Sequence, residues 1–166
     1  LQALPDALLI LVPRHPERFD AVARQVQDAG LAAVRRSSGQ LPAADQQVLV
    51  GDTMGELVML YACADVAFVG GSLVPNGGHN YLEPAALGLP VLSGQHRFNF
   101  TEISELLGGA GALQVVSDER ALALAVQALL GDEAARERAG AAGRAVVQDN
   151  QGALERLLAG IARLLG

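Results

Sequence analysis

A chain of 166 residues is long enough for one domain with a sizeable buried core. Its formal net charge of −6 and the lack of a long basic stripe argue against binding along a nucleic-acid backbone. Although 51% of the residues are hydrophobic, no run reaches the roughly 18–20 uncharged apolar residues that a membrane-spanning helix needs. The single cysteine, Cys63, excludes an internal disulfide, and its apolar surroundings predict a buried, unreactive thiol.

The start of the chain carries no sign of a secretion signal. It begins with Leu1 rather than methionine, and its apolar first stretch contains Asp6 and no basic segment. We therefore expect a soluble piece of a longer protein.

Short apolar runs alternate with amphipathic stretches along residues 7–116. The first run, ALLILV, is continuous, which is typical of a strand buried on both faces. Pro16 suits the first turn of the helix that follows, and Gly30 ends it. Strands are expected at residues 7–12, 32–35, 47–50, 66–69, 90–93 and 113–116, and helices around residues 16–29, 55–63, 81–87 and 100–107.

Three further helical stretches, at residues 117–130, 132–148 and 152–165, follow without a strand between them. Six short strands that alternate with helices predict an α/β fold, a Rossmann-like doubly wound parallel sheet with extra C-terminal helices. No linker, internal repeat or low-complexity tract divides the chain. We expect residues 1–166 to form a single Rossmann-like domain.

A glycine-rich segment, GGSLVPNGGHNYLEPAALGLPV at residues 70–91, follows the fourth expected strand. Ligands of doubly wound sheets bind at the carboxyl ends of the strands, where this segment lies. Gly77 and Gly78 can adopt positive φ and let backbone N–H groups approach a ligand, and the helix start that follows favours anions. Pro84 must lie in or next to the first helical turn, so the N-cap is expected near Asn80, with Gly88 ending a two-turn helix. These features predict a site for a small anionic ligand.

The same residues allow a purely structural interpretation. Asn80 and Glu83 have the spacing of a capping box, in which Glu83 bonds back to its own helix end. A glycine bend before a helix also serves packing in many α/β folds. The residues alone leave both interpretations open.

Four motifs follow one another along the chain: PRHPERF (residues 13–19), DTMGEL (52–57), ADVAFVGGSLVPNGGHNYLEPAA (64–86) and GQHRFNF (94–100). Together they resemble the C-terminal half of the Kdo transferases, which add 3-deoxy-D-manno-oct-2-ulosonic acid (Kdo) from CMP-Kdo to lipid A precursor in Gram-negative bacteria. Two departures are Tyr81 and Gln95, which stand where the family usually has proline; neither removes a ligand-contacting group, and we expect Tyr81 to alter slightly how the loop sits.

The resemblance implies one half of a GT-B glycosyltransferase, in which two Rossmann-like domains face each other across a cleft. This chain is then the donor-binding domain of an inverting enzyme of lipopolysaccharide biosynthesis at the cytoplasmic face of the inner membrane. The acceptor site, the membrane association and the general base belong to the absent N-terminal domain. The fragment is expected to bind CMP-Kdo without catalysing transfer, with no cofactor, no metal and no nucleic-acid partner.

The resemblance also implies a role for ten residues in binding CMP-Kdo. The phosphate is expected at residues 77–80, and Glu83 is expected to accept from the ribose hydroxyls, with the helix cap as the alternative. Arg14 pairs with the phosphate or the Kdo carboxylate, or is a surface arginine. The ten are Arg14, His15, Thr53, Met54, Gly55, Gly77, Gly78, His79, Asn80 and Glu83.

Several neighbouring residues keep alternative interpretations. Met54 packs on the cytosine, or it fills the core while Asp52 or Thr53 caps a helix. His96 and Asn99 shape the edge of the cleft or a local turn, and the histidines lack metal-ligand spacing. No role is assigned to Arg35 or Arg36, which end the second expected strand.

Two other functions remain as alternatives to a Kdo transferase. The chain could be the donor domain of a GT-B enzyme that uses a UDP- or GDP-sugar. It could also be a non-catalytic α/β binding module in which the glycine bend serves packing.

Overall fold

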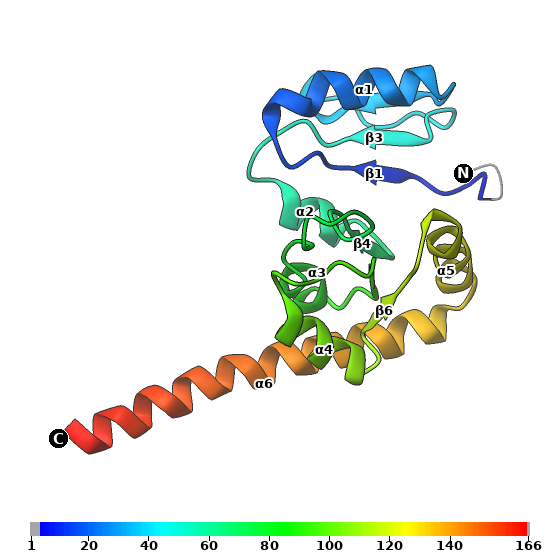
Figure 1. The fold of residues 1–166 in the computed structure, drawn as a ribbon. Coiled ribbons are helices and arrows are strands. Elements are labelled where there is room, and N and C mark those ends of the chain that lie inside the picture. Colours follow the sequence, from blue (N-terminus) through cyan, green and yellow to red (C-terminus); the bar gives the residue numbers. More distant parts are fainter. Residues whose placement is uncertain (1–3, 166) are drawn as a thin grey trace. The chain divides into compact units, whose positions relative to one another are not determined.

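The computed structural model describes residues 4–165, and it describes the side chains of residues 4–150 (Figure 1). The chain forms two compact units, Leu1–Cys63 and Ala64–Gly166. Each unit has its own three-stranded parallel sheet with helices packed around it. The expectation that both units belong to one domain stays a prediction.

The first unit is built on a sheet with the strand order β1-β3-β2. Leu11, Val50 and Arg35 pair at the same level, so the three strands end together at one edge. Its elements are β1 (Leu9–Leu11), the 3-10 helix η1 (Pro16–Arg18), α1 (Phe19–Asp28), β2 (Ala33–Arg35), the 3-10 helix η2 (Arg36–Ser38), β3 (Val48–Val50) and α2 (Leu57–Ala62).

The apolar face of α1 covers this sheet as its spacing predicts. Val22, Ala23 and Val26 are buried, and Val26 packs with Val48 and Val50 of β3. Gly30 ends the helix region with a φ of +73°. The expectation that the first strand is buried on both faces is wrong, because β1 lies at the edge of its sheet and Leu9 is exposed, whereas the central strand β3 is fully buried.

The second unit has the strand order β4-β5-β6, and β5 is its buried central strand. Its largest cluster of buried side chains joins Val69 and Val91 of the sheet to Tyr81, Leu107 and Val147. The elements are β4 (Ala67–Val69), α3 (Leu82–Ala86), β5 (Val91–Ser93), α4 (Thr101–Gly109), β6 (Leu113–Val115), α5 (Glu119–Gly131) and α6 (Glu133–Leu165).

Helix α6 lies against α3, α4 and α5 (Figure 1). Gly140 of α6 lies against the backbone of Gly88, so a Cβ at Gly140 would collide with the carbonyl of Gly88. A Cβ at Gly88 would collide with the side chain of Arg144 of α6. Arg144 of α6 donates from Nη2 to the carbonyl of Leu87 at 3.1 Å. These contacts fix the end of α3, which leads into the central strand β5.

Six parallel strands and the C-terminal helices agree with the predicted fold class. Hydrogen bonds, however, join the strands into two three-stranded sheets and not into one sheet of six strands. The two stretches expected at residues 132–148 and 152–165 form the single helix α6, because a glycine inside a helix costs only about 1 kcal/mol and packing can offset it. Cys63 is exposed instead of buried, because α2 ends at Ala62 and Cys63 is its cap residue. Within the described part of the chain, no helix has the length and apolar character needed to cross a membrane.

Candidate functional site

The glycine bend and the loop after β5 lie at the same edge of the second unit's sheet. Val69 and Ser93 pair at the carboxyl ends of β4 and β5, and residues 70–80 and 94–100 follow them directly. Loops at this edge form the ligand sites of parallel α/β sheets.

Gly77 and Gly78 take left-handed conformations, with φ of +83° and +75°. Both positions are also closed to a side chain. A Cβ at Gly77 would collide with Asn99 and Phe98, and a Cβ at Gly78 would collide with the hydroxyl of Tyr81. The predicted positive φ is therefore confirmed, and tight packing under the bend adds a second reason for glycine.

Asn99 ties the loop after β5 to this bend. Its side-chain Nδ2 donates to the carbonyl of Asn76 at 3.1 Å, and its backbone N–H donates to the carbonyl of Gly77 at 3.3 Å. Of the two roles considered for Asn99, the structure places it in a local one that holds the bend.

The buried residue Ser72 connects the same two loops through hydrogen bonds. Its Oγ donates to the carbonyl of Val69 at 2.6 Å and accepts from the backbone N–H of Gly94 at 2.8 Å. The carbonyl of Ser72 accepts from the backbone N–H of His96 at 2.9 Å, and a Cβ at Gly94 would collide with the Ser72 backbone. The bend is thus attached to the loop after β5 by Ser72 as well as by Asn99.

Two backbone donors expected to face a ligand are used inside the protein. The N–H of Gly78 donates to the carbonyl of Gly71 at 3.0 Å, and the N–H of Leu82 donates to Oδ1 of Asn80 at 2.9 Å. The half-buried ring of His79 lies against Gly71, where a Cβ would come within 3.2 Å of its Nε2. The N–H groups of Gly78 and Leu82 therefore already have partners inside the protein, and the phosphate site at this bend stays a prediction.

The predicted capping box does not form. Helix α3 begins at Leu82 with Tyr81 as its N-cap, one residue later than expected, and spans five residues instead of two turns. Glu83 consequently occupies the second helical position, from which its Oε1 accepts at 3.0 Å from the side-chain Nδ2 of Asn80. Asn80 and Glu83 are in contact, but through their side chains.

The side chain of Tyr81 belongs to the hydrophobic core of the second unit. Its side chain is 0% exposed, and its ring meets that of Phe100 edge to face with centroids 5.9 Å apart. Its hydroxyl lies 2.8 Å from Oγ of Ser93. The ring is therefore part of the core of the second unit, and its hydroxyl lies next to Gly78 of the bend.

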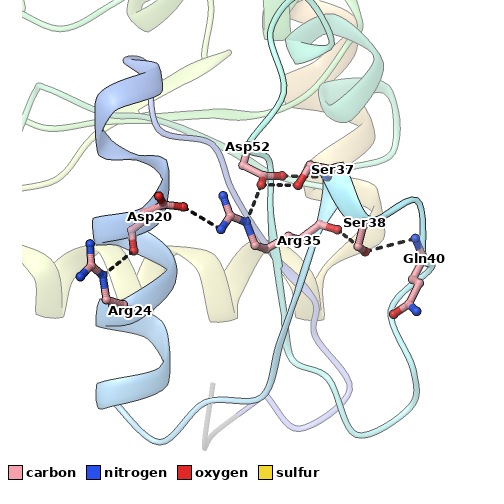
Figure 2. A network of polar contacts seen from close by, with 7 residues as sticks. All are labelled: Asp20, Arg24, Arg35, Ser37, Ser38, Gln40 and Asp52. Atoms are coloured by element: carbon pink, nitrogen blue, oxygen red, sulfur yellow. Dashed lines mark hydrogen bonds and ion pairs between the residues drawn. The ribbon is translucent and has the colours of Figure 1, made fainter.

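The first unit gathers charged side chains at the carboxyl edge of its own sheet (Figure 2). The side chain of Asp52 is 1% exposed and accepts three hydrogen bonds, from Nε of Arg35 at 2.5 Å, from the backbone N–H of Ser37 at 2.8 Å and from Oγ of Ser37 at 2.6 Å. Arg35 lies between Asp52 and Asp20 of α1, to which its Nη1 donates at 2.7 Å.

These contacts determine the charge states of Asp52 and Arg35. Burial by itself would raise the pKa of Asp52, but the hydrogen bonds from Ser37 and Arg35 outweigh it and hold that pKa below its ordinary value. The hydrogen bonds to Asp52 and Asp20 raise the pKa of Arg35. Asp52 is therefore a carboxylate and Arg35 a guanidinium cation at neutral pH.

A second carboxylate holds the other end of the same loop. Glu56 accepts from Nη2 of Arg36 at 2.8 Å and, through its other oxygen, from the hydroxyl of Thr53. Between these anchors Gly55 has a φ of +81°, and the side chain of Met54 is 66% exposed. Two interpretations are thereby corrected: Met54 does not fill the core, and Asp52 does not cap α2, which begins only at Leu57.

Arg14 and His15 follow β1 at this edge, and both are exposed. His15 Nδ1 lies 4.0 Å from Oε1 of Glu17. The first unit thus carries Arg14, His15, Thr53, Met54 and Gly55 of the expected site, and the second carries Gly77, Gly78, His79, Asn80 and Glu83.

Sequence reasoning missed the residues that hold these loops in place. Arg35 is the last residue of β2, and Arg36 and Ser37 directly follow it, beside the point where β3 leads into Asp52. The sequence pattern that could have indicated them is the pair of consecutive arginines, together with the two carboxylates Asp52 and Glu56 in one loop. In the second unit, Ser72 and Ser93 offered no signal, because single serines at strand ends are common.

Two cavities border the loop after β5 and the charged cluster of the first unit. One of about 250 Å³ is bordered by residues 95–98 with Thr101 and Ser104, and one of about 410 Å³ lies between α1 and β2. Neither is lined by any of the ten expected site residues. Among the residues with described side chains, no group of three or more His, Cys, Asp or Glu is placed to hold a metal ion.

Comparisons with known proteins agree with the motifs. Residues 28–146 match the family "Glycosyl transferases group 1". The chain is 51% identical over 159 residues to the 3-deoxy-D-manno-octulosonic acid transferase of Haemophilus influenzae, and 45% identical over 166 residues to that of Bordetella pertussis. These matches cover 95% and 99% of this chain but only 37% and 39% of the relatives, so the chain spans less than two fifths of their length.

A solved structure extends the similarity to three dimensions. The crystal structure of the C-terminal CMP-Kdo binding domain of WaaA from Acinetobacter baumannii matches with a TM-score of 0.85 and 40% sequence identity. The match covers 89% of this chain and 77% of that one. The chain therefore belongs to the group 1 glycosyl transferases, and within that family it corresponds to the C-terminal domain of the Kdo transferases.

Proposed function

We propose that this chain is the donor-binding domain of an inverting Kdo transferase, which moves Kdo from CMP-Kdo to lipid A precursor in lipopolysaccharide biosynthesis. The observation that carries the proposal is the close structural match to a CMP-Kdo binding domain. The glycine bend at the carboxyl edge of β4 supports it independently, because this is where ligands of such sheets bind.

In the second unit, we assign the donor phosphate to the bend at residues 77–80. The missing side chains of Gly77 and Gly78 let a ligand approach the backbone. Because Gly78 donates to Gly71, the polar side chains of His79 and Asn80 contribute more of the phosphate contact than a row of backbone donors would. A five-residue helix adds little dipole, so α3 is a minor part of this assignment.

Glu83 is assigned to the ribose of the donor. Each oxygen of a carboxylate can accept more than one hydrogen bond, so the contact with Asn80 leaves acceptor capacity for the ribose hydroxyls. Asn80 also restricts the rotamer of Glu83, which lowers the entropy lost when a ribose binds.

In the first unit, we assign contact with cytosine to residues 53–55. A thioether held at the surface is well suited to lie on the face of a base, and Met54 is such a side chain. Arg14 is assigned to the phosphate or the Kdo carboxylate, which its planar fork of donors matches, and His15 lies next to it.

The remaining steps belong to the portion of the relatives that this chain does not cover. We propose that the general base, the acceptor site and the association with the cytoplasmic face of the inner membrane lie there. The 166-residue chain is therefore expected to bind CMP-Kdo but to transfer no Kdo. Measurable turnover by the purified chain would contradict this division of roles.

Titration of the isotope-labelled chain with CMP, UMP and GMP tests the proposed function. Selective binding of CMP is expected, with a Kd on the order of 0.1 to a few mM, because half of a two-domain cleft leaves much of the ligand in water. Tighter binding of UMP or GMP would favour a transferase that uses another nucleotide sugar. No chemical-shift change at residues 76–84 with any nucleotide would favour a packing role for the bend.

A further inference from the structure

Asp52 and its partners act on the loop that carries Thr53, Met54 and Gly55. We propose that Asp52 is a positioning residue, which fixes this loop through Arg35 and Ser37 in the conformation that receives the donor's base. The inference rests on the proposed function and deepens it, because it concerns residues that hold the base-contacting loop and do not touch the ligand themselves.

The buried state of Asp52 is the first observation behind this assignment. A carboxylate with 1% exposure must have its lone pairs satisfied by the protein, and both of its oxygens accept hydrogen bonds here. A helix cap does not explain this burial, because α2 begins five residues later. The three contacts instead attach the end of β3 to the end of β2 (Figure 2).

The loop itself supplies the second observation. Regular pairing ends at Val50, with one further bond from the N–H of Gly51 to the carbonyl of Leu11 at 2.9 Å, and α2 starts at Leu57. Residues 53–56 therefore belong to neither a strand nor a helix that could hold them. The exposed centre of the loop, Met54 and Gly55, is flanked on one side by Asp52 and on the other by Glu56.

Consecutive residues hold the two anchors. Arg35 and Ser37 bind Asp52, while Arg36 binds Glu56. The segment 35–37, at the end of β2, therefore fixes both ends of a loop whose centre is exposed. Fixing a loop before binding removes the conformational entropy that binding would otherwise have to overcome.

Asp20 provides a matched control for a purely structural role. It binds the same Arg35, at 2.7 Å from Nη1, but it stands on α1, is 71% exposed and, within the described residues, forms no hydrogen bond or ion pair with residues 52–56. Asp20→Asn removes one ion pair of Arg35 without releasing Asp52. Asp52→Asn keeps the size of the side chain while it removes the charge and one acceptor oxygen.

The first measurement needs no ligand. Amide hydrogen exchange and the Met54 methyl signal are recorded for the 166-residue chain, well below the melting temperature of each variant. We expect faster exchange at residues 53–55 in Asp52→Asn, and wild-type exchange in Asp20→Asn. Because this comparison is independent of nucleotide, it remains decisive even if the proposed function fails.

The second measurement is CMP affinity. Asp52→Asn is expected to bind CMP about five- to tenfold more weakly and to lose part of the preference for CMP over UMP, while Asp20→Asn stays within about twofold of wild type. If Asp52→Asn does not fold, Ser37→Ala replaces it, because it removes only the Oγ contact; about a two- to threefold loss is then expected. Wild-type loop exchange together with wild-type CMP affinity in the folded variant would overturn the proposal. A wild-type chain that binds no CMP would overturn the proposed function alone.

Discussion

The hydroxyl of Tyr81 lies 2.8 Å from Oγ of Ser93, and both side chains are fully buried. Oγ of Ser93 also lies 3.0 Å from the carbonyl of Gly94, to which it donates its single proton, so Tyr81 must be the donor to Ser93. This bond connects the N-cap residue of α3 to the end of the central strand β5. The glycine bend is thereby supported from inside the core.

Tyr81→Phe should lower the free energy of unfolding by about 1–2 kcal/mol, because it leaves Ser93 without its buried donor while it keeps the contact with Phe100. For a domain of this length, the melting temperature should fall by about 2–4 °C per kcal/mol. Urea unfolding and thermal melts measure the change. In the double variant Tyr81→Phe with Ser93→Ala, the two losses should be less than additive, because both remove the same bond. Strict additivity would show that the bond contributes nothing.

Gly78→Ala should destabilise the chain much more than Gly30→Ala. Both glycines have a φ near +75°, but only at Gly78 does a Cβ meet another atom, the hydroxyl of Tyr81; around Gly30 there is open space. We expect a loss of about 1 kcal/mol at Gly30 from backbone strain alone and about 3 kcal/mol at Gly78. Chemical denaturation of both variants provides the comparison.

The collision can also be tested by its relief. Tyr81→Phe should cost less stability in the Gly78→Ala background than in wild type, because there it also removes the atom that collides with the new Cβ. Equal losses at Gly30 and Gly78, with the same cost of Tyr81→Phe in both backgrounds, would contradict the packing seen at the bend.

Glu83→Gln should separate a structural role of Glu83 from ribose recognition. Glutamine keeps a carbonyl oxygen that can accept from Asn80, so the melting temperature should stay nearly unchanged. The affinity for CMP should fall about five- to thirtyfold, because a carboxamide replaces a charged acceptor of the ribose hydroxyls.

The preference for CMP over 2′-deoxy-CMP should largely disappear in the same variant. Thermal melts with nucleotide titrations measure both effects, and Glu105→Gln, at an exposed position of α4, serves as the control. A variant that melts lower but binds both nucleotides as wild type does would make Glu83 a structural residue.

Asp52 should make stability depend on pH in acid. Its pKa in the folded chain is lowered by Ser37 and Arg35, so the unfolded state binds the proton more readily. The stability that the carboxylate contributes is complete above its unfolded pKa of about 3.9 and is lost as the pH falls through the lower pKa of the folded state. Urea unfolding between about pH 2 and pH 6 should show this loss in wild type.

Asp52→Asn should flatten that dependence while it lowers stability at neutral pH. Some slope should remain, because the pKa of Asp118 is also lowered, mainly by the backbone N–H of Ala121 and the hydroxyl of Ser117 at the start of α5. An unchanged slope in Asp52→Asn would show that the buried ion pair does not control acid stability.

The sequence by itself determined the elements and the place of the glycine bend. Apolar runs identified all six strands, because a strand buried in a parallel sheet needs continuous hydrophobic residues. The left-handed conformations of Gly77 and Gly78, and the helix ends at Gly30 and Gly88, were predictable because glycine alone takes positive φ without strain. Motif order along the chain likewise identified the family that the comparisons support.

Only the tertiary structure decided which polar residues meet. Arg35 and Asp52 are 17 residues apart, and their contact depends on the pairing of β2 beside β3, which local patterns do not specify. The burial of Tyr81 likewise depends on Ser93 and Phe100, which come from the next strand and loop. Local propensity acts over a few neighbouring residues, whereas buried hydrogen bonds and ring contacts depend on strand register and packing; the sequence alone therefore located the loops, and the fold decided what holds them.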